Sequence, residues 1–260
     1  MRTSVMWKEL TASELRDLAS HDATVILPVA SMEQHGPHLA VGVDTILCEA
    51  VCKRAAEVVA AELAVVVAPT LWCGMAEHHM AFGGTFTFDI PTYRAVLSSL
   101  LKSIARHGFT KVFIVNGHGG NISALAAFLP DFAVETGLTI RVTTYFELAQ
   151  PAMPTFLEDQ ERVRHACEGE TSMMLALASD CVRSDQLIDA HGPRHSTPQP
   201  LGVGQYRSFR SFTDTGVVGD ARRATKDKGE QLTRVCCDAL VAVLRDEQVW
   251  RRSDRADQGS

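Results

Sequence analysis

The sequence predicts an α/β fold in which a mostly parallel β-sheet is covered by helices on both faces, a three-layer α/β/α sandwich. Two observations support this prediction. Continuous apolar runs alternate with longer segments whose apolar residues recur at helical spacing. Apolar residues make up 46% of the 260 residues and charged residues 22%, which is the composition of a globular protein that can bury a large core.

Four segments are expected to be strands, because each is an apolar run bounded by turn residues, as in strands buried on both faces. They are residues 23–31, 63–70, 110–117 and 138–147. Helices are expected at 44–63, 92–108, 122–137, 169–179 and 226–248, with Pro130 kinking or breaking the third. Residues 189–224 are expected to form long loops. We expect residues 1–250 to form one domain and the polar residues 251–260 to form a disordered tail.

Composition also narrows the class of partner. A net charge of -6 gives no sign of polyanion binding, so nucleic acid is not an expected partner. No apolar run approaches the roughly 20 residues that cross a bilayer, and the amino terminus lacks the apolar segment of a secretory signal. Seven cysteines without a CxxC pair indicate reduced thiols. The prediction is a cytoplasmic protein that binds neither membranes nor nucleic acid.

The segment "ASMEQHGPHLAVGVD", residues 30–44, gathers acids and imidazoles directly behind the first expected strand. Glu33 and His35 are two residues apart, so in an extended segment both point to the same side. Asp44 stands at an expected helix start, where a carboxylate can bridge two cations or cap the helix. The alternative is that Asp44 is only a cap and that Glu33 and His35 are solvated loop residues.

Two further motifs follow along the chain. In "FIVNGHGGN", His118 lies between glycines directly after a strand, and Asn116 and Asn121 can hold the loop by hydrogen bonds. In "HACEGETSMMLAL", Glu170 heads an apolar helix, where it is either a metal ligand or an acid that complements the helix dipole. Because ligand sites of parallel sheets lie beyond the carboxyl ends of the strands, the motifs after the strands are expected to open onto one edge.

Taken together, these motifs supply oxygen and nitrogen donors without thiolates. The candidate ligands are Glu33, His35, Asp44, His118 and Glu170. Such a donor set suits Zn²⁺, Mn²⁺ or Fe²⁺, and it accommodates one ion, or two if a carboxylate bridges them.

The ordered motifs "LPVASMEQHGPHLAVGVD", "GMAEHHMAFGGT", "FIVNGHGGN" and "HACEGETS" resemble those of the creatininase family over most of the chain. The resemblance implies a cytoplasmic metal-dependent hydrolase of C–N bonds with a three-layer α/β/α fold, usually a homohexamer. It also implies that the five candidate ligands hold one or two divalent ions.

This sequence departs from the creatininases at the substrate site. Gly119 and Gly120 follow the central histidine, where creatininases carry an aromatic residue and a glutamate, so a possible metal-binding carboxylate is lost. Phe146 stands where one of the creatinine-covering tryptophans is expected, and Glu161 is the nearest match to the other. The expected substrate is therefore a small-molecule amide, lactam or cyclic amidine other than creatinine.

The expected mechanism is hydrolysis by metal-activated water. His165 or Glu168 delivers a proton to the departing nitrogen, and the backbone N–H groups of Gly119 and Gly120 stabilise the oxyanion. His79 is expected to line the pocket together with Phe146, although a packed or surface histidine is an equally good interpretation. The loop arginines Arg194, Arg207 and Arg210 are candidates for holding an anionic group, but arginines in loops are more often simply solvated.

Several other classes of function stay open at this point. Ser31 and Ser172 raise the possibility of a serine hydrolase, but the sequence contains no GxSxG elbow. Cys167, beside His165, is a possible thiol nucleophile. Within the family resemblance, a formamide deformylase or a short-peptide hydrolase is an alternative. A non-catalytic metal-binding scaffold is the alternative outside the enzymes.

Overall fold

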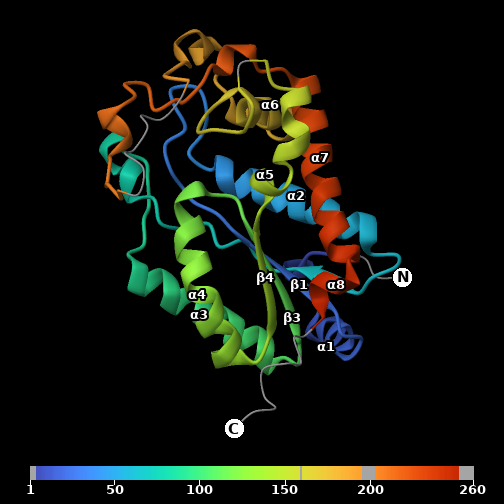
Figure 1. Ribbon diagram of the computed structural model, residues 1–260. Helices are drawn as coiled ribbons and strands as arrows, with labels where there is room; N and C mark the ends of the chain where they lie inside the picture. The colour runs from blue at the N-terminus through green and yellow to red at the C-terminus, as the bar shows by residue number, and fades with distance from the viewer. Residues whose placement is uncertain (1–3, 159, 195–202, 252–260) are drawn as a thin grey trace.

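The computed structural model describes residues 4–158, 160–194 and 203–251. Its sheet contains four parallel strands in the order β2-β1-β3-β4 (Figure 1). They are β1 (Thr24–Val29), β2 (Val65–Val67), β3 (Lys111–Asn116) and β4 (Thr139–Thr144). Thr24 is in register with both Val65 and Lys111, and Lys111 with Thr139, so all four strands start at one edge and end at the other. The predicted parallel sheet is confirmed.

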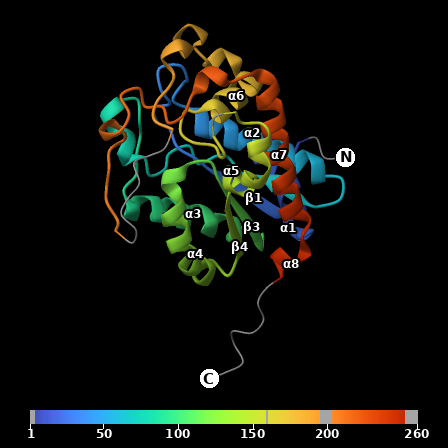
Figure 2. The ribbon, with the colours of Figure 1, turned by 45° about the horizontal axis from the view of Figure 1, so that its top comes forward.

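Helices cover both faces of the sheet. One face carries α2 (Val43–Val59) and α7 (Lys226–Arg245), with α6 (Glu168–Leu177) packed against α7 (Figure 1). The other face carries α1 (Ala12–Ser20), α3 (Ile90–Arg106) and α4 (Ile122–Thr136), as Figure 2 also shows. Neighbouring strand residues point to opposite faces, so Ile26 belongs to the first core and Val25 and Leu27 to the second. This burial on both faces explains why the strands read as continuous apolar runs.

Two of the expected helices differ from the prediction in detail. The helix α4 continues through Pro130 without a break. Pro130 and Ala126 are both exposed, so the carbonyl group that loses its partner four residues before the proline faces water. The last long helix ends at Arg245, because the Asp246 side chain accepts a hydrogen bond from the Gln248 amide and starts α8 (Glu247–Trp250).

Short elements make up much of the remainder. A single α-helical turn, α5 (Tyr145–Leu148), follows β4. The 3₁₀ helices are η1 (Trp7–Glu9), η2 (Glu77–Phe82), η3 (Gly119–Asn121), η4 (Gln150–Thr155), η5 (Ser179–Cys181), η6 (Ser184–Asp189), η7 (Phe209–Ser211) and η8 (Ala221–Arg223). None of the helices in the described ranges is long and apolar enough to cross a membrane. Apart from Arg251, the predicted tail at 251–260 lies outside the described residues.

Candidate metal centre

The loop after β1 carries Glu33 and His35 into the interior. The Ala30 amide donates to the Leu71 carbonyl (2.8 Å), and the Glu33 amide donates to the Val41 carbonyl (3.0 Å), so the loop is fixed on both sides of the motif. Glu33, His35 and Asp44 are at most 3% exposed. The interpretation of Glu33 and His35 as solvated loop residues is therefore wrong, and the N-cap of α2 is Gly42 rather than Asp44.

A network of two asparagines holds the loop after β3, as predicted. Asn116 accepts a hydrogen bond from the His118 amide (3.1 Å) and donates one to the His118 carbonyl (2.7 Å). Asn121 donates to the Ala30 carbonyl (3.2 Å), which ties this loop to the one after β1. The carboxyl ends of β1 and β3 thus present their polar residues side by side.

The five candidate ligands converge around Asp44. Its Oδ1 lies 3.2 Å from His35 Nε2, which is itself 3.8 Å from Glu170 Oε2. Its Oδ2 lies 3.1 Å from His118 Nδ1, which is itself 3.2 Å from Glu33 Oε2. We call His35, Asp44 and Glu170 the inner donor group, and Glu33, Asp44 and His118 the outer donor group. Because Asp44 belongs to both groups, it is placed to bridge two cations.

Hydrogen bonds fix which nitrogen of each imidazole faces the carboxylates. His35 donates its Nδ1–H to the Glu33 carbonyl (3.1 Å), and His118 donates its Nε2–H to the Met75 carbonyl (3.2 Å). The other nitrogen of each ring therefore faces the donor groups and offers them a lone pair when the imidazole is neutral. Backbone carbonyls orient metal-binding histidines in this way.

A cation fits this arrangement because buried polar atoms lack partners here. Within the described part of the chain, Glu33 Oε2, His35 Nε2 and Asp44 Oδ2 are fully buried and make no hydrogen bond. Buried polar atoms are nearly always paired, and binding of divalent cations at the donor groups would give these three atoms partners. The oxygen and nitrogen donors suit Zn²⁺, Mn²⁺ or Fe²⁺.

The electrostatics of the site also favour a cation. Burial, reinforced by the nearby Asp44 carboxylate, raises the pKa of Glu170 to about 8. Burial lowers the pKa of His35, but the facing carboxylates, Asp44 foremost, outweigh it and bring that pKa to about 9. Acids that resist ionising beside a histidine that holds its proton indicate a cluster short of positive charge, as functional sites often are.

His79 and His165 both lie near Glu33 Oε1, whereas His118 of the outer donor group lies near Glu33 Oε2. His165 Nε2 lies 2.7 Å from the Gln34 carbonyl oxygen and 2.9 Å from the Gln34 side-chain nitrogen, while its Nδ1 lies 3.4 Å from Glu33 Oε1. The Gln34 side chain donates to His79 Nδ1 (2.8 Å), so His79 turns its Nε2–H toward the same Glu33 oxygen at 3.3 Å. Gln34 therefore contacts a ring nitrogen of both histidines.

These side chains lie at a cavity of about 290 Å³. Its lining includes the predicted residues Glu33, Asp44, His79, His118, Gly119, Gly120, Phe146, His165 and Glu170. It also includes residues that the sequence analysis did not select: Gly117, His78, Val163, Arg164 and Phe209. The doubled histidine of "EHHMAFGGT" was a usable signal for His78, whereas nothing in the sequence marks Phe209, whose ring centroid lies 4.0 Å from that of His79.

The structure corrects the suggestion that Glu168 delivers a proton. Successive residues of an α-helix are rotated by about 100° around its axis, so residues two apart point to nearly opposite sides. Glu168 and Glu170 therefore diverge at the start of α6. Glu168 is fully buried and accepts hydrogen bonds from Lys228 Nζ (2.6 Å) and from the Glu158 amide. Glu168 does not line the cavity. Of the two candidate proton donors, His165 and Glu168, it is His165 that lines it.

The alternative nucleophiles are also placed away from the cavity. Cys167 Sγ accepts N–H groups from Arg164 (3.2 Å) and Gln160 (3.0 Å), and burial raises the pKa of its thiol to about 11. The Ser172 hydroxyl donates to the Glu168 carbonyl (2.7 Å). Neither these residues nor Ser31 line the cavity. Arg194, Arg207 and Arg210 do not line it either, and Arg210 Nη1 donates to the Asp214 carbonyl (3.0 Å).

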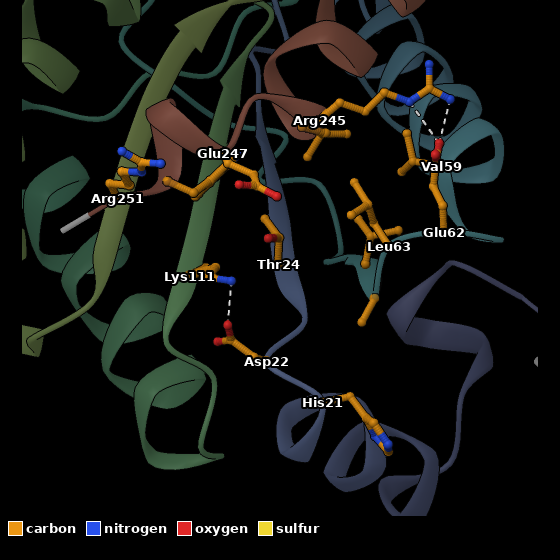
Figure 3. Close-up of a pocket in the computed structure, with 14 residues that line it drawn as sticks. His21, Asp22, Thr24, Val59, Glu62, Leu63, Lys111, Arg245, Glu247 and Arg251 are labelled. Atoms are coloured by element: carbon orange, nitrogen blue, oxygen red, sulfur yellow. Dashed lines mark hydrogen bonds and ion pairs between the residues drawn. The ribbon is translucent and has the colours of Figure 1, made fainter.

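A second cavity, of about 500 Å³, lies at the opposite edge of the sheet, among Thr24, Val65 and Lys111 at the strand starts (Figure 3). Two pairs of opposite charges lie among its lining residues. Lys111 Nζ lies 2.5 Å from Asp22, and Arg245 Nε donates to Glu62 at 2.8 Å. In the described ranges, the groups of three or more potential metal ligands all lie at the first cavity, so the chemistry is concentrated there.

Comparisons with known proteins agree with this site. A family model described as creatinine amidohydrolase (Creatininase) matches residues 8–244. The chain belongs to the creatininase family. It is 30% identical over 257 residues to the creatinine amidohydrolase of Pseudomonas putida, covering 93% of this chain and 94% of that protein. It is also 30% identical over 227 residues to the mycofactocin precursor peptide peptidase of Mycolicibacterium smegmatis, covering 86% and 85%.

Solved creatininases share the fold. A creatinine amidohydrolase structure superimposes with a TM-score of 0.83 at 26% identity, covering 97% of this chain and all of that one. A creatininase structure described as a Zn-Zn type superimposes with a TM-score of 0.81 at 27% identity, covering 95% of this chain and 99% of that one. A manganese form superimposes with a TM-score of 0.79 at 28% identity, covering 94% of this chain and 99% of that one. The predicted family and fold are confirmed. Divalent metal binding is supported by these relatives and by the donor groups, whereas a small-molecule substrate rather than a peptide stays a prediction, because one relative is a peptide peptidase.

Proposed function

We propose that this protein is a metal-dependent hydrolase that cleaves the C–N bond of a small-molecule amide, lactam or cyclic amidine other than creatinine. The observation that carries the proposal is the pair of donor groups sharing Asp44 at the wall of a 290 Å³ cavity, with His165 directly beside them. One or two divalent ions held there (Zn²⁺, Mn²⁺ or Fe²⁺) would acidify a water molecule and polarise the substrate carbonyl group.

The residues of this chain would bind, orient and move protons around that chemistry. With its Nε2–H donated to the Gln34 carbonyl, His165 would use Nδ1 to accept a proton and return it to the departing nitrogen. His79 donates toward Glu33 Oε1 and keeps that carboxylate turned between the two rings. The backbone amides of Gly119 and Gly120 line the cavity and are assigned to the developing oxyanion.

The walls of the cavity support a small substrate. A volume near 290 Å³ is at the lower end for small-molecule sites. Phe146, Val163 and Phe209 supply apolar surface, while Glu161, the nearest match to a creatinine-covering tryptophan, does not line the cavity. Phe146, at the position expected for one of those tryptophans, and Phe209, from a different segment, support a substrate other than creatinine.

A short peptide is the second candidate substrate. It is favoured by the 30% identical relative named as a peptide peptidase, which shows that the family fold admits such substrates. Only one end of a peptide would enter a cavity of this size. The homohexamer that the family resemblance implies, and a cytoplasmic location, are part of the proposal. Size-exclusion chromatography with light scattering tests the assembly.

Metal depletion tests the proposal as a whole. The protein is stripped with a chelator, refilled with Zn²⁺, Mn²⁺ or Fe²⁺, and assayed on lactams, imides, formamides and peptide ends. We expect activity to follow metal content and the melting temperature to fall on depletion, since a ligand at 1,000 times its Kd contributes about 4 kcal/mol. Glu33→Gln should lose bound metal and most activity. The control is Glu57→Gln, at an exposed position of α2, which should lose neither. A metal-free protein whose melting is unchanged by chelation would indicate the non-catalytic scaffold instead.

A further inference from the structure

His78 lies beside the outer donor group, in the 3₁₀ helix η2. One of its ring nitrogens, a Glu33 carboxylate oxygen and a His118 nitrogen all lie within 4.8 Å of one another, close enough to share one cation. Its ring stacks on that of His118, with centroids 5.7 Å apart and planes inclined by 12°. His78 also lines the cavity, so it approaches the outer donor group from the substrate side.

The glycine at position 120 is what makes this approach possible. A Cβ atom at Gly120 would lie 2.3 Å from His118 Nε2, 2.4 Å from the Met75 carbonyl oxygen and 2.8 Å from His78 Cε1. A larger residue at position 120 therefore excludes the present positions of both His118 and His78.

The neighbouring histidines differ in whether their nitrogens are already used. His79 accepts a hydrogen bond from Gln34 at Nδ1 and turns its Nε2–H to Glu33. Among the described residues, His78 makes no hydrogen bond through either ring nitrogen, and its contacts are with the rings of His79, His118 and Phe209. An imidazole facing two metal donors with an unused nitrogen has the chemistry of a further ligand.

We propose that His78 is a metal ligand that completes the outer donor group. The ion there would be held by two carboxylates, from Glu33 and Asp44, and two imidazoles, from His78 and His118. Four such donors match the coordination number that Zn²⁺ prefers. The inference deepens the proposed function, on whose metal centre it rests.

A pair of variants separates ligation from packing. His78→Gln and His78→Glu place side chains of nearly equal size at a half-buried position, but only the glutamate offers a charged donor. His21→Ala, on the exposed end of α1, is the control. Each metal-depleted protein is titrated with Zn²⁺ and with Co²⁺, followed by elemental analysis and by the visible absorption of bound Co²⁺. Neither readout requires a substrate.

We expect His78→Gln to bind one ion fewer than wild type, His21→Ala and His78→Glu, or to bind the outer ion more than about 100-fold more weakly. Even partners outside the ligand shell change metal affinity by about 10- to 100-fold, so the loss of a ligand should cost more. The Co²⁺ spectrum of His78→Gln should lose the bands of that ion. Equal metal content and identical Co²⁺ spectra in wild type and His78→Gln would overturn the assignment of His78 and leave the proposed function standing. A wild-type protein that binds no metal would overturn both.

Discussion

Gly229 offers a sharp test of how the fold places the metal centre, because two effects on stability oppose each other there. It lies in α7 where that helix crosses α6. A Cβ atom at this position would lie 1.8 Å from the Ser172 carbonyl oxygen. Helix propensity alone predicts that Gly229→Ala stabilises the protein by about 1 kcal/mol, whereas the contact predicts destabilisation.

The geometry decides which effect is larger. The contact must widen from 1.8 Å to at least 3.0 Å, so α6 and α7 have to separate locally by about 1.2 Å. No side-chain rotation relieves it, because the partner is a backbone carbonyl. Overpacking costs about 1–3 kcal/mol and sometimes more. Taking the upper part of that range and subtracting the propensity gain, we expect a net loss of about 2 kcal/mol. For a chain of this size that corresponds to a fall in melting temperature of about 4–8 °C.

Thermal denaturation followed by circular dichroism measures the effect, with Gly204→Ala as the control, since an added Cβ at Gly204 meets no atom within 4 Å. Because Ser172 lies two residues after Glu170, the displaced helix should also weaken the ion held by the inner donor group, which Zn²⁺ titration detects. If Gly229→Ala melts at or above the wild-type temperature, the close crossing of α6 and α7 does not exist as described.

Three further predictions address the site. Burial raises the pKa of the Cys167 thiol to about 11, so iodoacetamide at pH 7.5 should leave both Cys167 and activity intact; parallel loss of thiol and activity would revive the thiol nucleophile. Phe209→Ala should raise KM about 10-fold or more with unchanged metal content, since burying an aromatic side chain is worth about 1.5–3 kcal/mol; an unchanged KM would exclude this ring from substrate contact. Burial raises the pKa of Glu170 from 4.5 to about 8. In metal-depleted protein this carboxyl group therefore ionises at a lower pH in the unfolded chain than in the folded one, so the free energy of unfolding falls as the pH rises from about 4.5 to about 8. Glu170→Gln should lose this component, and its melting temperature relative to wild type should rise between pH 5 and pH 8; a constant difference would contradict the shift.

Some of these features were readable in the sequence because they depend on local patterns. Strands buried on both faces leave continuous apolar runs, so 110–117 predicted β3 (Lys111–Asn116) closely. Parallel strands end at one edge, so residues such as Glu33 and His118, each directly after a strand, were expected to meet. The structure brings these two side chains to 3.2 Å of each other.

Other features depend on contacts between distant segments, which no local pattern records. Gln34 has no titratable group, and its role appears only because His165, 131 residues away, donates to its carbonyl group. Phe209 is one of three nearby aromatic residues, with Tyr206 and Phe212, in a region expected to form loops, and nothing local distinguishes it from the other two. Glu168 and Glu170 were not distinguished because their directions depend on the turn at which α6 begins. With Cys167 as the N-cap, Glu168 faces Lys228 and Glu170 faces His35.

Glu33 links the proposed metal centre to His79 and to His165, the side chain proposed to transfer protons. Its Oε2 lies 3.2 Å from His118 in the outer donor group, and its Oε1 lies 3.3 Å from His79 and 3.4 Å from His165. Burial raises the pKa of Glu33, so without a cation this acid tends to keep a proton. Only an ionised Glu33 can accept the Nε2–H of His79 while its other oxygen serves a metal. The charge of the bound ion and the protonation pattern around His165 are therefore coupled through Glu33. Metal binding should thus ionise Glu33 and order the hydrogen bonds around His165, in addition to acidifying the water molecule.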